Sequence, residues 1–492
     1  MPHPLEILSR AAHPDEVKDP TSRAAMLAVV GALRQQLPAG CFPDPHQVVG
    51  IAYCALTNDR CLVADEMGIG KSHVGISRIL LSRAYPVLVV ATASTLHKVW
   101  VQEPEKWLPH VRIHVCNDEQ SPVPPRGFQG IVVTTWGLLD GLLPKLLALR
   151  PQLLIADEAH YAKNAGTEGP DGRGIQRADA LARLAAASPR CLLLTGTPME
   201  NNAQELFRLL RILDPRVWND EAPFKGMRAD EIDDAEEANS PLQRRIRQYM
   251  IRRLKKDVFP EMAAKQYEEV LVELPPAAMV EYQEVEKRFL AWFTRMIQAR
   301  ATMLANKGTD ARTIEQRINA AIKGEALVRL QVLRKIVGVF KIPAAMRWIR
   351  KKRAEREPVL VFAEHQEVLL ALSAQLESEG IKWAKIDGRT PKKKRLKAAD
   401  DFQQERADVM LGSKAACEGL TLHRACYVLQ VERWWTPTKE DQGADRLHRR
   451  GQKRDVVVTR IHVRGTIDQR LDSLNTEKRK IIERVVDARG GA

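Results

Sequence analysis

The stretch LVADEMGIGKSHVG, at residues 62–75, constrains the fold of this chain more than any other feature. Just before and within it, the apolar run CLVAD (61–65) predicts a short buried strand, and the apolar spacing of HVGISRILLSRA (73–84) predicts a helix. A strand, a glycine-containing turn and a helix start, in that order, are the context of a phosphate-binding loop. Gly68 and Gly70 let main-chain N–H groups approach phosphate oxygens, and the helix N-terminus adds positive partial charge.

Each polar residue of this loop has an expected task. Lys71 would reach the β- and γ-phosphates of a nucleotide, and the Ser72 hydroxyl would bind Mg²⁺. Asp65 stands where the general loop pattern has its first glycine, so a glycine-rich turn that binds no nucleotide remains the alternative. The candidate nucleotide-binding residues of the loop are Met67, Gly68, Ile69, Gly70, Lys71 and Ser72.

A second motif, PQLLIADEAHYAKN at 151–164, supports the nucleotide interpretation. Its apolar strand ends in two acids, at the carboxyl end where open α/β sheets bind their ligands. Nucleotide hydrolysis needs acids with different tasks: Asp157 would help to hold Mg²⁺, and Glu158 would orient or polarise the attacking water. His160 completes the Asp-Glu-Ala-His run and is a further candidate for the nucleotide site. Together, the two motifs predict an ATPase that uses ATP and Mg²⁺.

Length and composition place the chain among globular proteins with several domains. At 492 residues it is too long for one ordinary core, and 45% hydrophobic with 28% charged residues is typical of a folded protein. No apolar run is long enough to cross a bilayer, and the N-terminus lacks a signal-peptide pattern. The seven cysteines are scattered without zinc spacing. We therefore expect an intracellular protein without membrane contact, in the cytoplasm or nucleoid of a bacterial or viral host or in a eukaryotic nucleus.

The charge balance favours a polyanionic partner. The formal net charge is +14 and the sequence pI is near 9.5. Basic residues cluster in both halves of the chain, although a solvated helix face explains the run at 350–356 equally well. The four basic runs lie at 244–256, 350–356, 392–397 and 446–454.

Further motifs give the chain a resemblance to a known family. DEMGIGKS and DEAH, together with LLLTGTPMENNAQELFRLLRILDP (192–215), resemble the Swi/Snf-type family of helicase superfamily two, whose members are ATP-driven DNA translocases. KIPAAMRWI, LVFAEHQEVL and GLTL are most similar to its annealing-helicase (HepA-related) subgroup. WWTP and RRGQ depart from the usual family pattern. Other segments resemble family motifs in the expected order, at 44–51, 88–109, 250–258, 358–369, 385–391, 409–437 and 441–471.

The resemblance implies an α/β fold of two RecA-like lobes, each a parallel sheet flanked by helices, with helical protrusions. Helical apolar spacing at 280–304 and 313–340, around a turn at 307–310, agrees with a protrusion, and a coiled-coil dimer is the alternative to the monomer that we expect. The expected divisions are an N-terminal lead at 1–36, an ATP-binding first lobe at 37–256, a linker at 257–279, the protrusion at 280–345, a second lobe at 346–472 and a closing helix at 473–492.

The resemblance also assigns residues around the nucleotide. Gln47 matches the glutamine that reads adenine, and Gly419 would let backbone come close to DNA or nucleotide. If DQGADRLHRRGQ is helical, Gln442, Arg446 and Arg449 share one face. Two guanidiniums on that face suit a γ-phosphate, and the family implies that Arg446 and Arg449 reach the nucleotide held by the first lobe. A solvated basic helix is the alternative.

Contacts to DNA are expected mainly at its phosphates, so binding should be independent of base sequence and sensitive to salt. With only 5% aromatic residues, a channel that stacks single-stranded bases is disfavoured, and each tryptophan fits packing better than base stacking. Thr195 and Thr197 are expected to link the nucleotide state to the DNA side of the first lobe. The candidate DNA-binding residues are Ser94, Lys98, Trp100, Thr135, Thr195, Thr197, Ser413, Lys414 and Trp434.

Two functions of different classes follow from these motifs. The first is a DNA-dependent ATPase that translocates on duplex or branched DNA and has a role in DNA repair. It would remodel or anneal replication and repair intermediates, or displace bound protein. DNA structure or a partner protein would recruit it. The second is a regulator clamp that uses ATP as a switch on a nucleic-acid polymerase or another partner, without processive movement. An intact phosphate loop and arginine face favour the first.

Overall fold

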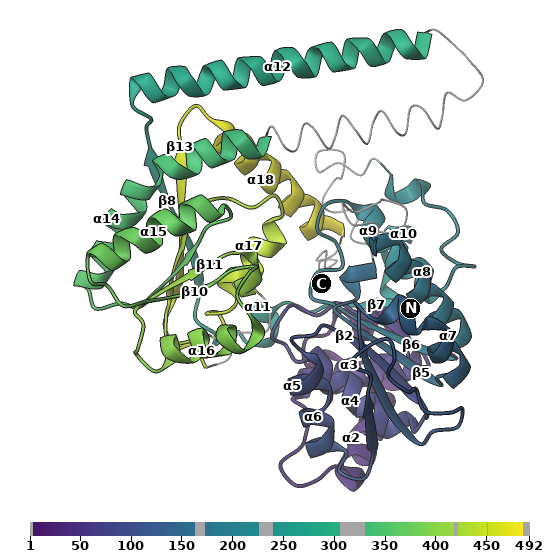
Figure 1. The fold of residues 1–492 in the computed structure, drawn as a ribbon. Coiled ribbons are helices and arrows are strands. Elements are labelled where there is room, and N and C mark those ends of the chain that lie inside the picture. The colour runs from purple at the N-terminus through teal and green to yellow at the C-terminus, as the bar shows by residue number, and fades with distance from the viewer. Residues whose placement is uncertain are drawn as a thin grey trace. The chain divides into compact units, whose positions relative to one another are not determined.

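The computed structural model describes residues 3–162, 173–225, 240–305, 330–417, 422–449 and 451–485. The chain divides into two compact units, Met1–Met262 with Glu477–Ala492, and Ala263–Thr476, which we call the first and second lobe. Each contains a parallel sheet flanked by helices, so the predicted α/β class and the two-lobe organisation are confirmed (Figure 1). Among the described residues, no helix is both long and apolar enough to span a membrane.

The first lobe is built on a seven-stranded parallel sheet with strand order β3-β4-β2-β5-β6-β1-β7. Its central strands are short apolar runs that are buried along their whole length, as expected for a sheet covered on both faces. The predicted strands before the phosphate loop and before the two acids are both present, as β1 and β5. The strands are β1 Arg60–Val63, β2 Val87–Ala91, β3 Arg112–Val115, β4 Gly130–Thr135, β5 Leu153–Asp157, β6 Arg190–Leu194 and β7 Met250–Ile251.

Helices cover both faces of this sheet, with α1 to α6 on one face and α7 to α10 on the other (Figure 1). Alternate residues along each strand point to the two faces, so neighbours such as Leu62 and Val63 join different cores. The helices are α1 Pro4–Arg10, α2 Pro20–Gln36, α3 Pro45–Leu56, α4 Lys71–Ser82, α5 Leu96–Trp100, α6 Gln102–Trp107, α7 Leu139–Leu149, α8 Arg173–Ala187, α9 Ala203–Leu213, α10 Pro241–Arg247 and α11 Lys255–Val258.

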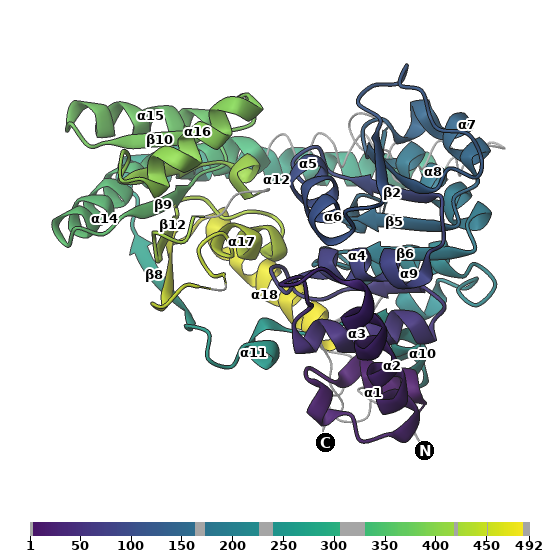
Figure 2. The same ribbon diagram turned by 90° about the horizontal axis from the view of Figure 1, so that it is seen from below.

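The N-terminal residues form part of the first-lobe core. Each of α1, α2 and α3 begins with a proline at a position where its fixed φ suits a helix start. The Asp19 side chain accepts a hydrogen bond from the Ser22 amide (2.7 Å) and caps α2. Leu8 and Leu33 are fully buried, and α1 and α2 lie against α3 (Figure 2). The expected lead at 1–36 is therefore packed against the lobe along most of its length.

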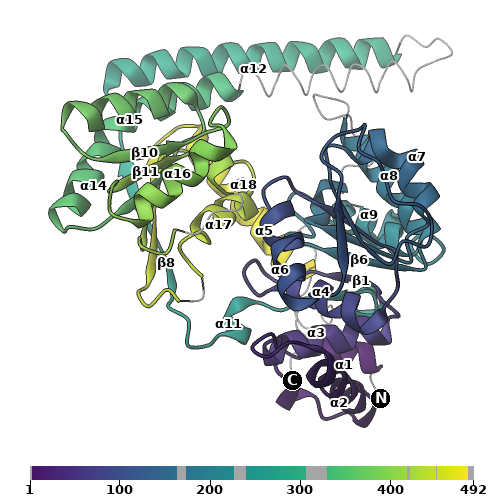
Figure 3. The same ribbon diagram turned by 60° about the horizontal axis from the view of Figure 1, so that its bottom comes forward.

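The second lobe contains a six-stranded parallel sheet with strand order β10-β11-β9-β12-β13-β8. Helices α14 and α15 bury one of its faces and α16 and α17 the other (Figure 3). The elements are β8 Lys265–Val272, β9 Val359–Phe362, β10 Trp383–Ile386, β11 Val409–Gly412, β12 Tyr427–Gln430, β13 Val456–Val463, α14 Ile342–Ala354, α15 Gln366–Ser378, α16 Lys392–Gln403 and α17 Pro437–Ala444.

The expected linker at 257–279 differs from the structure. Strand β8 lies inside it and pairs with β13 in parallel over eight residues, from Lys265 opposite Val456 to Val272 opposite Val463. Residues 265–272 therefore belong to the second sheet and are not a free connection. The prediction failed because β8 is an edge strand whose side chains are mostly exposed, so it lacks the apolar run of a central strand.

The long helix expected after the linker is present as α12 (Pro276–Ala305), and residues 330–340 are helical before α14. The fully buried Tyr282 packs with Leu333, Val337 and α18 (Ile467–Val485) in a separate small core. The predicted turn at 307–310 lies outside the described residues, so the helical pairing of the protrusion stays a prediction.

Candidate nucleotide site

The predicted phosphate loop connects β1 to α4 and has the backbone of a glycine-dependent turn. Gly68 and Gly70 both have positive φ, at 87° and 96°, and Gly70 is the left-handed residue directly before α4. A Cβ atom at Gly70 would lie 2.1 Å from the Gln47 Nε2 atom. Only glycine therefore fits this position, and the helix start leaves unpaired amides next to the loop. Met67, Ile69 and Ser72 belong to the same turn.

Helix α3 holds this loop from one side. The buried Gln47 side chain accepts a hydrogen bond from the Asp44 amide (2.9 Å) and donates one from Nε2 to the Ile69 carbonyl (3.1 Å). The His46 Nε2 atom lies 2.9 Å from the same carbonyl oxygen. The structure thus brings the predicted adenine-reading residue directly to the phosphate loop.

Lys71 begins α4 and faces the acids of the site. Its ammonium donates hydrogen bonds to the Asp65 carbonyl (2.8 Å) and the Glu66 carbonyl (3.3 Å). Burial lowers the pKa of Lys71, while the charges of Glu158, Asp65 and Asp157 oppose this change. A lysine held by main-chain carbonyls at a phosphate loop can exchange these partners for phosphate oxygens.

Asp157 ends β5 and is held by groups from the segment that follows β2. Its Oδ2 atom accepts a hydrogen bond from the Trp100 indole (2.9 Å), and the Thr95 hydroxyl lies 3.4 Å away. The carboxyl is only 6% exposed, and burial together with the charge of Glu158 raises the pKa of Asp157 to about 6. Asp157 and Leu194 are opposite each other, so the acid lies beside the end of β6.

Glu158 has a φ of 53°, which is uncommon for a residue with a side chain and typical of functional positions. Its Oε2 atom lies 3.2 Å from the His160 Nδ1 atom, which is also 3.2 Å from the Thr195 hydroxyl. The Thr195 hydroxyl in turn accepts a hydrogen bond from the Thr197 amide (3.1 Å). This chain of contacts joins the Asp-Glu-Ala-His motif to the Thr-Gly-Thr-Pro segment after β6.

These residues fit a phosphate-bound Mg²⁺ ion. Burial and the negative charge of Glu158 both disfavour the ionised form of Asp157. A bound cation would offset both of these unfavourable contributions. Carboxylate and hydroxyl oxygens are the ligands that Mg²⁺ prefers. Asp157 and Ser72 are the residues of this chain that would hold it.

Sequence reasoning missed the groups that support the loop from behind. Asp65 forms an ion pair with Arg253, and both side chains are almost fully buried. The Arg253 Nε atom donates to Asp65 Oδ1 (2.9 Å), and another of its nitrogens reaches the His46 carbonyl. Asp65, which departs from the general loop pattern, is therefore the carboxylate that anchors the loop to the segment after β7. The paired acid and arginine lie 188 residues apart, so no local signal identifies them.

Arg252 also helps to hold the phosphate loop in place. Its Nη1 atom donates to the Ala64 carbonyl (2.6 Å) and to the Gly196 carbonyl (3.1 Å), which links the ends of β1 and β6. The Glu66 side chain accepts a hydrogen bond from the Lys255 amide (2.7 Å). The basic run at 244–256 thus includes structural cations of the nucleotide site as well as surface charge.

The expected DNA contacts of the first lobe differ in exposure. Ser94 and Lys98 are exposed, and Thr135 is partly buried at the end of β4, opposite Ala91 of β2. All three follow the carboxyl ends of adjacent strands, so they lie on the same edge of the sheet.

Four further residues that were expected to contact DNA have buried side chains. Trp100 is 0% exposed and positions Asp157, and Trp434 is 1% exposed and packs edge-on against Phe362. Thr195 and Thr197 are 0% and 6% exposed and belong to the hydrogen-bonded chain at His160. Burial does not favour direct contact of these side chains with DNA, and their role at DNA stays a prediction.

In the second lobe, the expected helical face ends early. Helix α17 stops at Ala444, so Gln442 lies on the helix while Arg446 and Arg449 follow it in turns, and the single-helix argument is wrong in this detail. Gln442 and Arg446 are 4% exposed. Burial and the charge of Arg446 lower the pKa of Arg449 to about 10. That these two arginines form a phosphate-binding pair stays a prediction.

The remaining expected residues of the second lobe follow β11. Ser413 is buried and its amide donates to the Ile386 carbonyl (3.0 Å), whereas Lys414 is partly exposed and pairs with Glu364 (2.7 Å). Gly419 lies outside the described residues.

Comparison with known proteins gives matches over most of the chain. A model of the SNF2-related domain matches residues 46–333, and a model of the helicase conserved C-terminal domain matches residues 340–451. The mouse (Mus musculus) protein named DNA annealing helicase and endonuclease ZRANB3 is 26% identical over 90% of this chain and 41% of its own length. A Drosophila melanogaster SWI/SNF-related subfamily A-like protein 1 is 25% identical over 98% of this chain and 60% of its own.

Two further matches come from other organisms. An uncharacterized ATP-dependent helicase of Mycoplasma pneumoniae is 26% identical over 86% of this chain and 40% of its own length. The solved Sulfolobus solfataricus SWI2/SNF2 ATPase core in complex with dsDNA is 23% identical, covers 92% of this chain and 95% of that one, and has a TM-score of 0.39.

This chain spans between 40% and 60% of the length of the curated relatives that it matches. The SNF2-related model alone covers more than half of the residues, and it includes the phosphate loop, both acids and the segment after β6. The chain belongs to the SNF2-related family, with an SNF2-related domain followed by a helicase conserved C-terminal domain.

Proposed function

We propose that this protein is a DNA-dependent ATPase that translocates on duplex or branched DNA. The observation that carries the proposal is the meeting of the phosphate loop, the two acids and the Thr-Gly-Thr-Pro segment at the carboxyl ends of β1, β5 and β6. Family membership and the ZRANB3 relatives support remodelling or annealing of replication and repair intermediates, with displacement of bound protein as a related outcome.

In the first lobe, each group has a separate task. The loop amides between Gly68 and Ser72 bind phosphate oxygens, and Lys71 gives up its carbonyl partners to contact them. Glu158 orients the attacking water, and His160 holds the Glu158 carboxylate in place. Gln47, which lies on α3, contributes to the recognition of adenine.

Mg²⁺ bound by Asp157 and Ser72 would neutralise phosphate charge and orient the transferred group. Trp100 and Thr95 keep one Asp157 oxygen occupied, which fixes the direction in which the other oxygen points. The protein therefore supplies a carboxylate whose orientation is set before the ion binds.

In the second lobe, Arg446 and Arg449 supply positive charge to the transferred phosphoryl group during turnover, and Gln442 assists them. The short segment that carries both arginines supports this role, and the repulsion between their charges makes a bound anion favourable there. DNA phosphates are bound by exposed groups, among which Ser94, Lys98 and Lys414 are the best placed.

The ATPase rate with and without duplex DNA tests the proposal. A translocase hydrolyses ATP slowly alone and at least tenfold faster on duplex DNA, with stimulation that declines as salt rises. Comparison of duplex, forked and single-stranded DNA at equal nucleotide concentration identifies the preferred structure.

A regulator clamp that uses ATP as a switch is the second candidate function. It would bind ATP and DNA but show an ATPase rate that duplex DNA leaves unchanged. An unchanged rate would favour the regulator clamp and would contradict the translocase function.

A further inference from the structure

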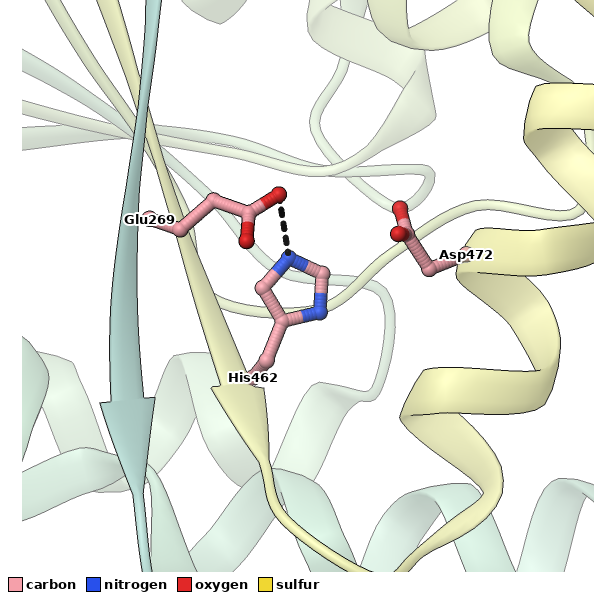
Figure 4. Close-up of side chains that lie close together, drawn as sticks. All are labelled: Glu269, His462 and Asp472. Atoms are coloured by element: carbon pink, nitrogen blue, oxygen red, sulfur yellow. Dashed lines mark ion pairs between the residues drawn. The ribbon is translucent and has the colours of Figure 1, made fainter.

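Three potential metal ligands lie close together in the second lobe. They belong to elements that carry none of the predicted nucleotide-binding residues. Glu269 comes from β8, His462 from β13 and Asp472 from α18 (Figure 4). In the parallel register Glu269 lies opposite Arg460, so it is on the same face of the sheet as His462, two residues further on. One ligand atom from each residue lies within 4.8 Å of the others.

The imidazole of His462 is buried without a hydrogen-bond partner at Nε2. The residue is 5% exposed, and within the described parts of the chain Nε2 accepts or donates no hydrogen bond. This nitrogen faces the Glu269 carboxylate at 3.7 Å, which is too long for a hydrogen bond (Figure 4). Leaving a buried polar atom unsatisfied is unfavourable, so the site favours a group that bonds to this nitrogen.

Cations already lie beside the cluster. The Asp472 side chain is 36% exposed, and one of its oxygens pairs with Arg433. Arg460 lies opposite Glu269 on the paired strand.

Two of the neighbouring cations, Arg433 and Lys341, have other acidic partners. Arg433 donates to both oxygens of Glu440 (2.7 Å and 3.1 Å), and Lys341 pairs with Asp468 (2.6 Å). Their repulsion of a bound cation is reduced accordingly, and Glu269 and Asp472 leave the cluster with negative charge. An arginine that holds one oxygen of a metal-binding carboxylate is an ordinary orienting partner.

We propose that Glu269, His462 and Asp472 form a binding site for a divalent transition-metal ion, with Zn²⁺ as the best fit. One imidazole nitrogen and two carboxylate oxygens are ligands that Zn²⁺ accepts, and water completes the coordination. Ligand atoms around Zn²⁺ are about 3.4 Å apart, so the cluster has to contract. The Glu269 side chain is 63% exposed and can supply that movement.

The bound ion would connect three elements of the second lobe. It would join the edge strand β8 to β13, with which β8 already pairs, and to the first turns of α18. Metal binding would therefore add to the support of this edge strand, which pairs through its main chain with β13 and through Lys265 with Asp445.

Calorimetric titration of the full chain with Zn²⁺, in a buffer that contains millimolar Mg²⁺, tests this proposal. We expect one site whose affinity falls at least about tenfold in His462→Gln, since even the loss of an outer-shell partner typically weakens metal binding by that factor. His97→Gln is the matched control, because His97 is an exposed histidine of the other lobe, and its affinity should equal that of the wild type.

A second pair of variants keeps the test decisive if His462→Gln folds poorly. Glu269→Gln should weaken Zn²⁺ binding at least about tenfold, whereas Glu273→Gln should not, although Glu273 is also exposed and follows the same strand. Zn²⁺ should also raise the thermal unfolding midpoint of the wild type and of Glu273→Gln, but not of Glu269→Gln. Equal Zn²⁺ affinity in the wild type and Glu269→Gln would overturn the proposed site.

Discussion

At the scale of single residues, the electrostatics of Asp157 connect stability to function. Its folded pKa of about 6 lies above that of an unfolded aspartate, so the ionised carboxylate is less favourable in the folded state. This penalty is fully present above pH 6 and disappears as pH falls below the unfolded value near 4. A bound cation would remove the same penalty at neutral pH.

Asp157→Asn should therefore raise the thermal unfolding midpoint of the nucleotide-free protein at pH 7.5 and abolish ATP hydrolysis. The amide oxygen can still accept the hydrogen bond from Trp100, while the buried charge is gone. Differential scanning calorimetry at pH 7.5 and pH 5 measures the effect, and the gain should be smaller at pH 5. A midpoint that falls at pH 7.5 would contradict the electrostatic account of this residue.

Gly70→Ala should prevent nucleotide binding while the protein remains folded. The new Cβ would overlap the Gln47 side chain at 2.1 Å and occupy a left-handed backbone position. Fluorescent-nucleotide titration measures the loss. Gly127→Ala is the matched control, because Gly127 has a similar φ of 83° with no atom within 4 Å of its Cβ position, and its nucleotide affinity should be unchanged.

Much of the site was predictable from the sequence, because its parts are contiguous. The phosphate loop and the two acids each occupy one short segment after an apolar strand, and the fold brings those segments together. The roles of Trp100 and Arg253 were not predictable, because each depends on contacts with residues 57 and 188 positions away. The family resemblance implied a DNA contact for Trp100, whereas its indole donates a hydrogen bond to Asp157 in the structure.

At the scale of elements, the apolar runs predicted the central strands and failed at the edge. Strands β2 and β5 are buried along their length, so their composition reveals them. Strand β8 is mostly exposed and is stabilised by pairing with β13, about 190 residues later, which a local pattern cannot detect. The end of α17 at Ala444 was missed for a related reason, since helical spacing alone does not determine where a helix stops.

The segment after β7 should act as a structural support of the phosphate loop. Arg253→Met would leave the buried Asp65 carboxylate without its cation and should lower the free energy of unfolding of the first lobe by about 3–5 kcal/mol. Urea denaturation followed by circular dichroism measures this loss. Arg350→Met removes an exposed ion pair with Glu379 and serves as the control, with little expected change. Equal midpoints for the two variants would contradict the supporting role.

At the scale of the whole molecule, we expect turnover to require residues of both lobes. Arg446→Ala should retain ATP binding and lose hydrolysis by on the order of 10³ or more, as expected when an arginine that stabilises transition-state charge is removed. Single-turnover hydrolysis, measured beside a nucleotide-binding titration, separates the two steps. Arg464→Ala is the control from the same lobe, because Arg464 pairs with Glu273 at an exposed position, and its turnover should match the wild type. An unchanged rate of hydrolysis in Arg446→Ala would contradict a catalytic role for this arginine.

Movement along duplex DNA is the central claim, and displacement of a triplex-forming strand measures it most directly. The wild type should release the third strand in an ATP-dependent manner without unwinding the duplex beneath it, and Lys71→Ala should bind the same DNA without releasing the strand. Efficient unwinding of ordinary duplexes would contradict tracking without strand separation. DNA-stimulated ATP hydrolysis without any release of the third strand would contradict translocation itself.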